Sequence, residues 1–261
     1  MQPNTQRQPT EGRSPVPPHS PLTNYYGEDA ERERYVADLF NKTAKHYNSV
    51  ERLFGNGGIL YRRLSLRRAG LRRGMKVLDV AMGTAAVGRG AAKIVGPEGL
   101  VVGVDPSQGM LAEAAKVFKG PRVRGYGQAL PIKSEHFDFV TMGIALRHVS
   151  DLRAAFSEYL RVLKPGGCVW LLEGHVPPSA LGKRVTRFMW KHLIPGMTLV
   201  ATRSREAKEL MDYYWDTVEK AVPPETIVSV LREVGFEDVR AQVTLPGAFI
   251  EYTGRKPASA A

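Results

Sequence analysis

The stretch that decides the fold is KVLDVAMGT, residues 76–84. An apolar run containing one acid leads into a turn of small residues, and residues 85–95 then have the composition of a helix. A strand, a tight turn and a helix in this order form a nucleotide-binding unit, because a ligand can approach the backbone N–H groups where the helix starts. The acid, Asp79, can accept a hydrogen bond from such a ligand. The sequence therefore predicts a ligand site at this turn.

A second apolar run, LVVGVD at residues 100–105, also ends in an acid. An acid about twenty residues beyond the glycine turn is placed to accept both hydroxyls of a ribose. The alternative is that Asp79 and Asp105 only cap the turns that follow their strands. The turn is also an imperfect match to Gly-x-Gly-x-Gly, because Ala85 stands where a glycine is typical, and alanine adopts a positive φ only at a cost.

Length and composition restrict the class of protein. The chain has 261 residues and is 43% hydrophobic, enough for one substantial core. Its single cysteine, Cys168, excludes an internal disulfide framework and fits a reducing compartment. No apolar run reaches the ~18 residues of a spanning helix, and the N-terminus lacks the apolar stretch of a secretory signal. We therefore expect a cytoplasmic protein, or one peripheral to the inner face of a membrane.

The formal net charge is +11, and the basic residues gather in two clusters, within 62–73 and within 183–192. Leu, Val, Phe, Met and Trp side chains surround the second cluster, as in basic amphipathic segments that contact an anionic membrane or a lipophilic substrate. The alternative is that both clusters are solvated helix faces. No recognisable nucleic-acid-binding module or stripe of stacking aromatics accompanies them, so no nucleic-acid partner is expected.

Apolar strands alternate with helical segments from residue 76 to residue 173, which is typical of an α/β fold with a parallel, doubly wound sheet. Residues 1–27 are rich in Pro, Gln, Ser and Thr, and this composition predicts a disordered tail. Residues 28–261 are predicted to form a single domain. Its parts are an N-terminal helical lid (28–74), a cofactor-binding core (75–173), a substrate-side insertion (174–222), and a C-terminal helix and strands (223–256).

Several short motifs point to one family. They are VLDVAxGT at 77–84, VGVDPSxGML at 102–111, ALP at 129–131, FDxVT at 137–141, LR at 146–147 and RVLKPGG at 161–167. Through them the chain resembles the S-adenosylmethionine-dependent C-methyltransferases of ubiquinone and menaquinone biosynthesis. The resemblance extends over residues 36–257. The KPGG turn is common to many methyltransferases, whereas the LR pair and the DPS context at 105–107 are typical of the quinone branch.

The resemblance implies a Rossmann-like, seven-stranded class I methyltransferase sheet with helices on both faces, bound S-adenosyl-L-methionine and a polyprenyl quinone as substrate. Asp79 and Gly83 are expected on the methionine side, and Asp105 at the ribose. Arg147 matches an arginine beside the reacting ring, where a cation stabilises an enolate-like oxygen or positions a water that removes the ring proton. The expected cofactor-binding residues are Tyr47, Asp79, Ala81, Gly83, Thr84, Asp105, Pro106, Met110 and Gln128.

Three places depart from the family pattern, and all fall in the expected site. Residues 85–86 are Ala-Ala instead of Gly-Asp, Tyr126 replaces an adenine-side acid, and His148 replaces an asparagine. Tyr126 and His148 therefore join Arg147 as candidate catalytic residues. His148 is either a general base, with an ordinary pKa near ~6.5, or a hydrogen-bonded residue at the start of a helix.

The expected activity is C-methyl transfer to the quinone ring. One alternative is replacement of a ubiquinone methoxy group by an amino group, as in rhodoquinone biosynthesis by a methyltransferase-like enzyme. Others are methylation of a different lipophilic molecule, because a fold does not name its substrate, and a non-catalytic binding module on a degenerate methyltransferase fold. No cluster of His, Cys, Asp and Glu has a clear metal-ligand spacing, so no metal is assigned.

Overall fold

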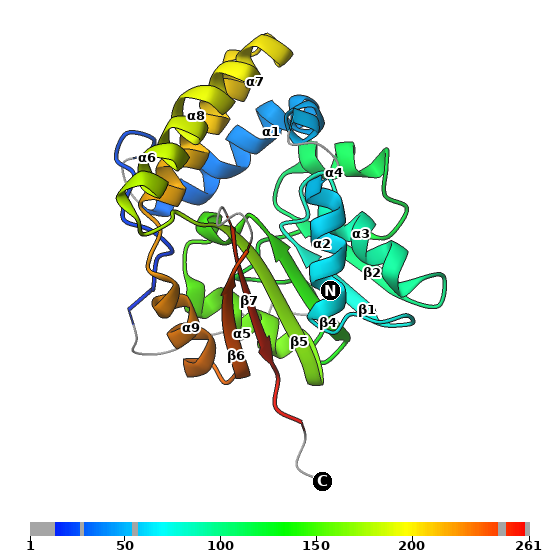
Figure 1. The fold of residues 1–261 in the computed structure, drawn as a ribbon. Helices are drawn as coiled ribbons and strands as arrows, with labels where there is room; N and C mark the ends of the chain where they lie inside the picture. The colour runs from blue at the N-terminus through cyan, green and yellow to red at the C-terminus, as the bar shows by residue number, and fades with distance from the viewer. Residues whose placement is uncertain (1–13, 27–28, 54–56, 245–248, 259–261) are drawn as a thin grey trace.

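The structure is a computed structural model that describes residues 14–26, 29–53, 57–244 and 249–258. A seven-stranded sheet runs through its centre with helices packed on both faces (Figure 1). The strands are β1 Lys76–Val80, β2 Leu100–Asp105, β3 Arg122–Arg124, β4 Phe137–Gly143, β5 Leu163–Gly174, β6 Glu237–Val243 and β7 Phe249–Arg255. The helices are α1 Asp29–Leu53, α2 Gly57–Arg68, α3 Ala86–Val95, α4 Gln108–Ala115, η1 Leu146–His148, α5 Leu152–Val162, α6 Ala180–Phe188, η2 Met189–Leu193, α7 Ile194–Thr202, α8 Arg205–Glu219 and α9 Pro224–Glu233.

The strand order across the sheet is β3-β2-β1-β4-β5-β7-β6. The first five strands are parallel, whereas β7 runs antiparallel between β5 and β6. Asp79 of β1 stands opposite Gly103 of β2 on one side and Thr141 of β4 on the other. The carboxyl ends of these strands therefore meet at one edge, where ligands of open parallel sheets bind. The predicted α/β, Rossmann-like class is confirmed.

Two hydrophobic cores cover the faces of the sheet. One joins the sheet to α5 and α9, and the other joins it to α2, α3 and α4. Trp170 on β5 is fully buried in the second core, and its indole N–H donates to Ser65 Oγ of α2 at 2.8 Å. The helix before the sheet is thereby fixed to a central strand.

β5 contains the KPGG turn within its own length. Leu163 already pairs with Phe137, and pairing resumes between Cys168 and Phe139, so residues 164–167 bulge out of the ladder. Gly166 adopts a φ of +75°, a conformation that glycine tolerates at low cost. The turn therefore interrupts the strand instead of preceding it.

A third layer of helices stands beyond the carboxyl edge of the sheet (Figure 1). It contains α1 and, from the predicted insertion, α6, η2, α7 and α8. Leu39 of α1 and Leu210, Tyr213 and Tyr214 of α8 are buried together in its core. Since α1 also packs against α4, this layer covers the edge where the β1 and β2 acids lie.

Residues 14–26, which we call the N-terminal strap, correct the expectation of a disordered tail. Leu22 and Tyr26 are buried in the core of the helical layer, and the Tyr25 hydroxyl donates to Asp216 Oδ2 at 2.7 Å. The Val16 N–H donates to Asp151 Oδ1 at 3.0 Å. The tail's few apolar residues lie together at its end, so a composition averaged over the whole segment misses them. Residues 1–13 and 27 of the predicted tail lie outside the described residues.

The strap should contribute measurably to stability. Leu22→Ala removes a side chain that is 2% exposed, and we expect the free energy of unfolding in urea to fall by about 2–4 kcal/mol. Thr23→Ala, at an exposed neighbouring position, is the control and should change it by less than about 0.5 kcal/mol. Equal unfolding free energies for the two variants would show that the strap is not part of the folded core.

Candidate functional site

The turn between β1 and α3 has an unusual backbone. Gly83 has a φ of +54°, and the alanines at 81 and 85 also adopt positive φ values, +51° and +69°. Alanine reaches this region only at a cost in free energy, so surrounding contacts must hold it there. The Met82 N–H donates to the Val104 carbonyl at 3.1 Å, and the Gly83 N–H donates to Asp105 Oδ2 at 2.8 Å. The turn is thus fastened to the end of β2.

Asp105 is the acid at the centre of this arrangement. It is 5% exposed, and its other carboxylate oxygen accepts the Ser107 N–H at 2.8 Å. Burial raises the pKa of Asp105 to about 6, although the two N–H groups favour the charged form. Ser107 caps α4 by accepting the Met110 N–H at 3.1 Å. The carboxylate is therefore oriented by backbone donors at the end of its strand.

Asp79, the other predicted acid, lies in a different environment. Its Oδ1 accepts the Thr141 hydroxyl at 2.8 Å, whereas the buried Oδ2 has no side-chain partner in the described part of the chain and lies against the backbone of Gly88. Burial raises the pKa of Asp79 to about 7. A Cβ atom at Gly88 of α3 would stand 2.9 Å from Oδ2. Asp79 therefore lies beneath the start of α3 and is not part of the cavity wall that Asp105 forms.

A cavity of about 70 Å³ lies where the turn, Asp105, α1, η1 and α8 meet. Six of the residues predicted to bind the cofactor line this cavity, namely Tyr47, Ala81, Gly83, Asp105, Pro106 and Met110. Thr84 is buried but does not line it, and its hydroxyl has no partner among the described residues. The sequence analysis missed Val36, Ala37, Phe40, Ser107, Gly143, Ile144, Ala145 and Tyr214 as lining residues. Phe40 belongs to the N-terminal segment predicted as a helical lid. The sequence does not show which side chains of that lid line a cavity.

Arg147 in η1 is fully buried behind this cavity. Its Nη1 donates to a carboxylate oxygen of Glu173 at the end of β5 and to the Ile144 carbonyl at 3.1 Å. The guanidinium carbon lies 4.1 Å from the centre of the Tyr214 ring. Burial disfavours the charge, but Glu173 together with the neighbouring tyrosines Tyr214, Tyr47 and Tyr213 outweighs it, so the pKa of Arg147 is raised. The Nε and Nη2 groups have no acceptor within the described ranges, so a ligand oxygen can accept from them.

His148 lines the cavity within a set of aromatic rings. It stacks on Tyr213 with ring centres 5.5 Å apart, and Phe40 meets it edge-on at 5.2 Å. Burial and the nearby charge of Arg147 lower the pKa of His148 well below its usual range, so the imidazole is neutral. Both ring nitrogens are buried without hydrogen-bond partners from residues 14–26, 29–53, 57–244 and 249–258. A neutral imidazole with a free nitrogen can accept a proton.

Tyr126 and Gln128 are not brought into this cavity. Tyr126 is 37% exposed and forms a single antiparallel bridge with Ala129, because the chain turns back after β3. Gln128 Nε2 donates to Ser150 Oγ at 3.1 Å and to Glu33. Neither Tyr126, predicted as a catalytic residue with Arg147 and His148, nor Gln128, predicted at the cofactor, therefore lines the cavity.

The cavity residues fit an adenosyl cofactor in chemistry. A strand-end carboxylate, a turn with close backbone approach and apolar walls are the features that hold a nucleoside. A pocket for a ligand of this size usually measures ~300–1,000 Å³, well above the 70 Å³ found here. Phe40 and Val36 of α1 occupy part of the space. A bound cofactor would therefore contact these two side chains of α1. Among the described residues, no three of His, Cys, Asp and Glu are grouped to hold a metal ion.

The fold is that of S-adenosylmethionine-dependent methyltransferases. A methyltransferase from Thermotoga maritima, described as a possible histamine N-methyltransferase, matches with a TM-score of 0.59 at 21% identity, over 84% of this chain and 99% of that one. The [4+2]-cyclase SpnF matches with a TM-score of 0.63 at 18% identity, over 87% of this chain and 97% of that one. At these identities the likeness concerns the fold alone.

Residues 28–256 match the ubiE/COQ5 methyltransferase family, and the chain belongs to it. The ubiquinone/menaquinone biosynthesis C-methyltransferase UbiE of Idiomarina loihiensis is 32% identical over 87% of this chain and 92% of its own length. The demethylmenaquinone methyltransferase of Symbiobacterium thermophilum is 33% identical over 87% of this chain and 94% of its own. The protein is therefore an S-adenosylmethionine-dependent methyltransferase by family, as the motifs predicted.

The raised pKa of Asp105 predicts how cofactor affinity depends on pH. The ionised carboxylate accepts hydroxyl hydrogen bonds, and protonation below about pH 6 converts one oxygen into a donor. Affinity should therefore fall as pH decreases, and calorimetry should find S-adenosylmethionine bound about tenfold more weakly at pH 5 than at pH 7.5. Asp79→Asn removes the other carboxyl group whose pKa is raised, and the affinity should still fall with decreasing pH as in the wild type. Asp105→Asn should abolish this pH dependence. A constant affinity over this range contradicts the assignment.

Proposed function

We propose that the protein transfers a methyl group from S-adenosylmethionine to a ring carbon of a polyprenyl quinone or a related lipophilic aromatic compound. The observation that carries this proposal is the position of the buried Arg147–Glu173 pair. Glu173 lines a second cavity of about 350 Å³. Tyr214, whose ring the Arg147 guanidinium contacts, lines the Asp105 cavity. Arg147 is therefore in contact with one wall residue of each cavity.

The second cavity suits an apolar ring in size and lining. Trp215 and Val218 of α8, Ile227 of α9 and Tyr252 of β7 form its apolar walls. Its 350 Å³ falls within the ~300–1,000 Å³ of small-molecule sites. It opens toward α6, so the predicted substrate-side insertion contributes Lys183 and Arg187 to its rim. We infer that the quinone ring enters from this side.

Residues at the boundary of the two cavities supply the protein's part of the chemistry. Bound S-adenosylmethionine supplies an electrophilic methyl group on a sulfonium. Arg147 would donate from Nε or Nη2 to a ring oxygen, and this stabilises the negative charge that makes the neighbouring carbon nucleophilic. His148, neutral and without a partner in the described chain, would accept the ring proton that the incoming methyl replaces. Glu173 keeps Arg147 charged and in place.

The exchange of a quinone methoxy group for an amino group is the alternative reaction on the same fold. Ala85, one of the departures from the family pattern, is fully buried at a φ of +69° in the cofactor turn. This position does not distinguish the exchange from methyl transfer. The two relatives described above are named for methylation, so we propose C-methyl transfer as the function.

Mass analysis of cellular quinones tests this function directly. In bacteria that lack their own quinone C-methyltransferase, the wild-type chain should restore the methylated quinone. Arg147→Lys preserves the charge facing Glu173 but removes the Nε and Nη2 donors, so we expect about 1% or less of the wild-type rate. S-adenosylmethionine affinity should stay within about threefold, since Asp105 and the turn are unchanged.

Arg153→Lys, at an arginine paired with Glu233 away from both cavities, is the matched control and should retain the wild-type rate. Full turnover by Arg147→Lys would contradict the assigned role of the arginine. Loss of methoxy with gain of an amine would favour the exchange reaction. An unchanged quinone pool would contradict both.

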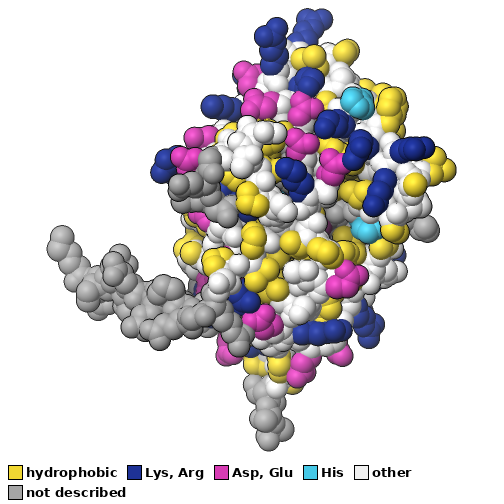
Figure 2. All heavy atoms as spheres, turned by 90° about the vertical axis from the view of Figure 1, so that its left-hand side faces the viewer, with side chains coloured by type: hydrophobic (Ala, Val, Ile, Leu, Met, Phe, Trp, Pro, Cys, Tyr) yellow, Lys and Arg dark blue, Asp and Glu magenta, His cyan; other side chains and the backbone are white. Residues whose placement is uncertain are grey.

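We also propose that the helices after β5 rest on an anionic membrane from which the substrate is drawn. The α6–α7 surface exposes apolar side chains together with basic ones. The apolar ones are Leu181, Val185, Phe188, Met189, Leu193, Met197, Leu199 and Val200, and the basic ones are Lys183, Arg184, Arg187 and Lys191. Figure 2 shows basic and hydrophobic side chains side by side over the upper part of this face, among some acidic ones. None of the helices in the described ranges is long and apolar enough to cross a membrane.

Vesicle flotation tests the α6–α7 surface. The protein should float with vesicles containing phosphatidylglycerol, and high salt should release it because the attraction is partly electrostatic. Leu181→Ser with Phe188→Ser should reduce the bound fraction at least fivefold. Val243→Ser removes an exposed apolar residue from β6 and should have no effect. Equal binding of all three proteins would exclude this surface.

A further inference from the structure

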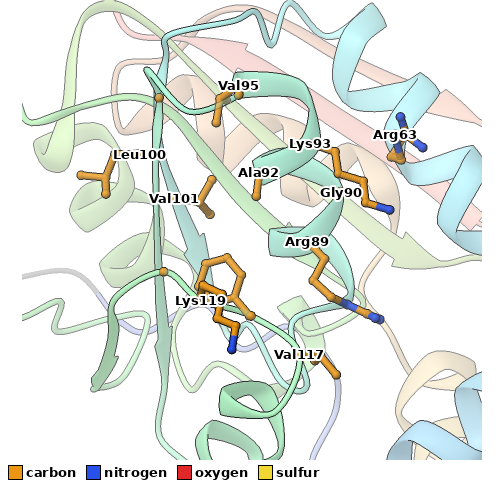
Figure 3. Close-up of a pocket in the computed structure, with 14 residues that line it drawn as sticks. Arg63, Arg89, Gly90, Ala92, Lys93, Val95, Leu100, Val101, Val117 and Lys119 are labelled. Carbon is orange, nitrogen blue, oxygen red and sulfur yellow. The ribbon is translucent and has the colours of Figure 1, made fainter.

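A large cavity lies at the other end of β2 from the cofactor turn. It measures about 790 Å³, is open on one side, and is lined by α2, α3, the start of β2 and the loop after α4 (Figure 3). We call it the basic cavity. Leu100 and Val101, at the start of β2, line it, whereas Asp105, at the end of that strand, lines the cofactor cavity. The two cavities are therefore separated by the length of a strand.

Cations from three separate segments line the basic cavity. They are Arg63 of α2, Arg89 and Lys93 of α3, and Lys119 of the loop after α4. Figure 3 shows Arg89 and Lys93 extending from α3, with Arg63 beside that helix and Lys119 on the loop. The residues that line the cavity include no Asp or Glu. Cations held around one hollow repel one another, so a bound anion relieves this cost.

Arg63 is held at the cavity by its packing on α3. Its side-chain stem lies against Gly90, where an added Cβ atom would stand 3.2 Å from Arg63 Cγ. The Arg63 Nε is buried and has no acceptor among the described residues. A buried donor without an acceptor is costly unless a ligand satisfies it.

Two further cations are available to a ligand. The Arg89 Nε donates to the Ala85 carbonyl at 3.3 Å, which fixes the stem of that side chain along α3. Lys93 lies in the last turn of α3 and offsets the partial negative charge of that helix end. Within the described ranges, none of Arg63, Arg89, Lys93 and Lys119 forms an ion pair with a carboxylate.

The remaining wall of the cavity is apolar. Val95, Val101 and Phe118 line it and are almost fully buried, while Val117 is 43% exposed at its edge. Guanidinium and ammonium groups beside an apolar wall match an anion that carries an apolar part. Arginine is well suited to phosphate, because its planar fork donates two parallel hydrogen bonds.

We propose that the basic cavity is a second ligand site, which binds a soluble phosphate-bearing compound with an apolar portion. Figure 1 shows α3 and β2 on the opposite side of the molecule from α6, so a membrane under the α6–α7 surface does not reach this cavity. A dissolved compound is therefore favoured over a lipid headgroup. The choice of a dissolved compound rests on the membrane surface proposed above, whereas the ligand site itself rests only on the residues of the basic cavity.

Calorimetry with phenyl phosphate and with inorganic phosphate tests the site. Phenyl phosphate should bind with one-site saturation, at least fivefold more tightly than inorganic phosphate, because only the former also contacts the apolar wall. Saturating S-adenosylhomocysteine should not displace it. Arg63→Gln with Lys119→Gln should weaken phenyl phosphate binding at least tenfold. Lys220→Gln with Arg240→Gln changes the net charge equally at exposed positions outside the cavity and should leave the affinity within twofold.

Thermal unfolding separates a lost site from a lost fold. Without ligand, both double variants should unfold within a few degrees of the wild type. Phenyl phosphate should raise the unfolding temperature of the wild type and of the control variant, but not of Arg63→Gln/Lys119→Gln. The proposal is overturned if phenyl phosphate does not saturate at millimolar concentration, or if both double variants bind it equally. It is also overturned, in favour of a lipid headgroup, if only phosphatidylglycerol vesicles show dependence on Arg63 and Lys119.

Discussion

The buried ion pair between Arg147 and Glu173 is the constraint on which the rest of the site depends. Removing two charges from water is expensive, and the attraction between them offsets part of this cost because they lie side by side. The pair joins η1 to the end of β5. Arg32 of α1 donates to the Arg147 carbonyl and also meets His19 of the strap at 2.7 Å. Segments far apart in sequence therefore converge on Arg147, through its side chain and through its backbone.

Asp79 and Asp105 hold similar positions in the sequence, near the ends of β1 and β2, but their surroundings in the fold give them different roles. Asp79 faces Thr141 and the start of α3, and an alanine at position 88 would crowd its Oδ2 atom. Asp105 faces the cavity and is oriented by two backbone N–H groups. Burial raises the pKa of both. Only Asp105 is exposed to a ligand, whereas Asp79 links β1 to β4 under the turn.

Local patterns predicted the parallel sheet and the meeting of Gly83 with Asp105, because parallel strands bring their carboxyl ends to one edge. They also identified the family, since its motifs lie in those strand ends. They did not predict the cavity walls from Phe40 and Tyr214, because these residues come from helices packed in a separate layer. Motif alignment grouped Tyr126 with the site, but the chain turns back after β3 and leaves it exposed. The packing of the N-terminal strap was not predicted, because only a few of its residues, such as Leu22 and Tyr26, are buried.

The small volume of the cofactor cavity has a kinetic consequence. α1 forms one wall of this cavity through Phe40 and Tyr47, and the Tyr47 hydroxyl is hydrogen-bonded to that of Tyr214 at 2.9 Å. Two helices from distant segments are thereby joined across the site. Helices that cover a site in this way exclude water from the reacting groups, and in many enzymes their opening limits the release of product.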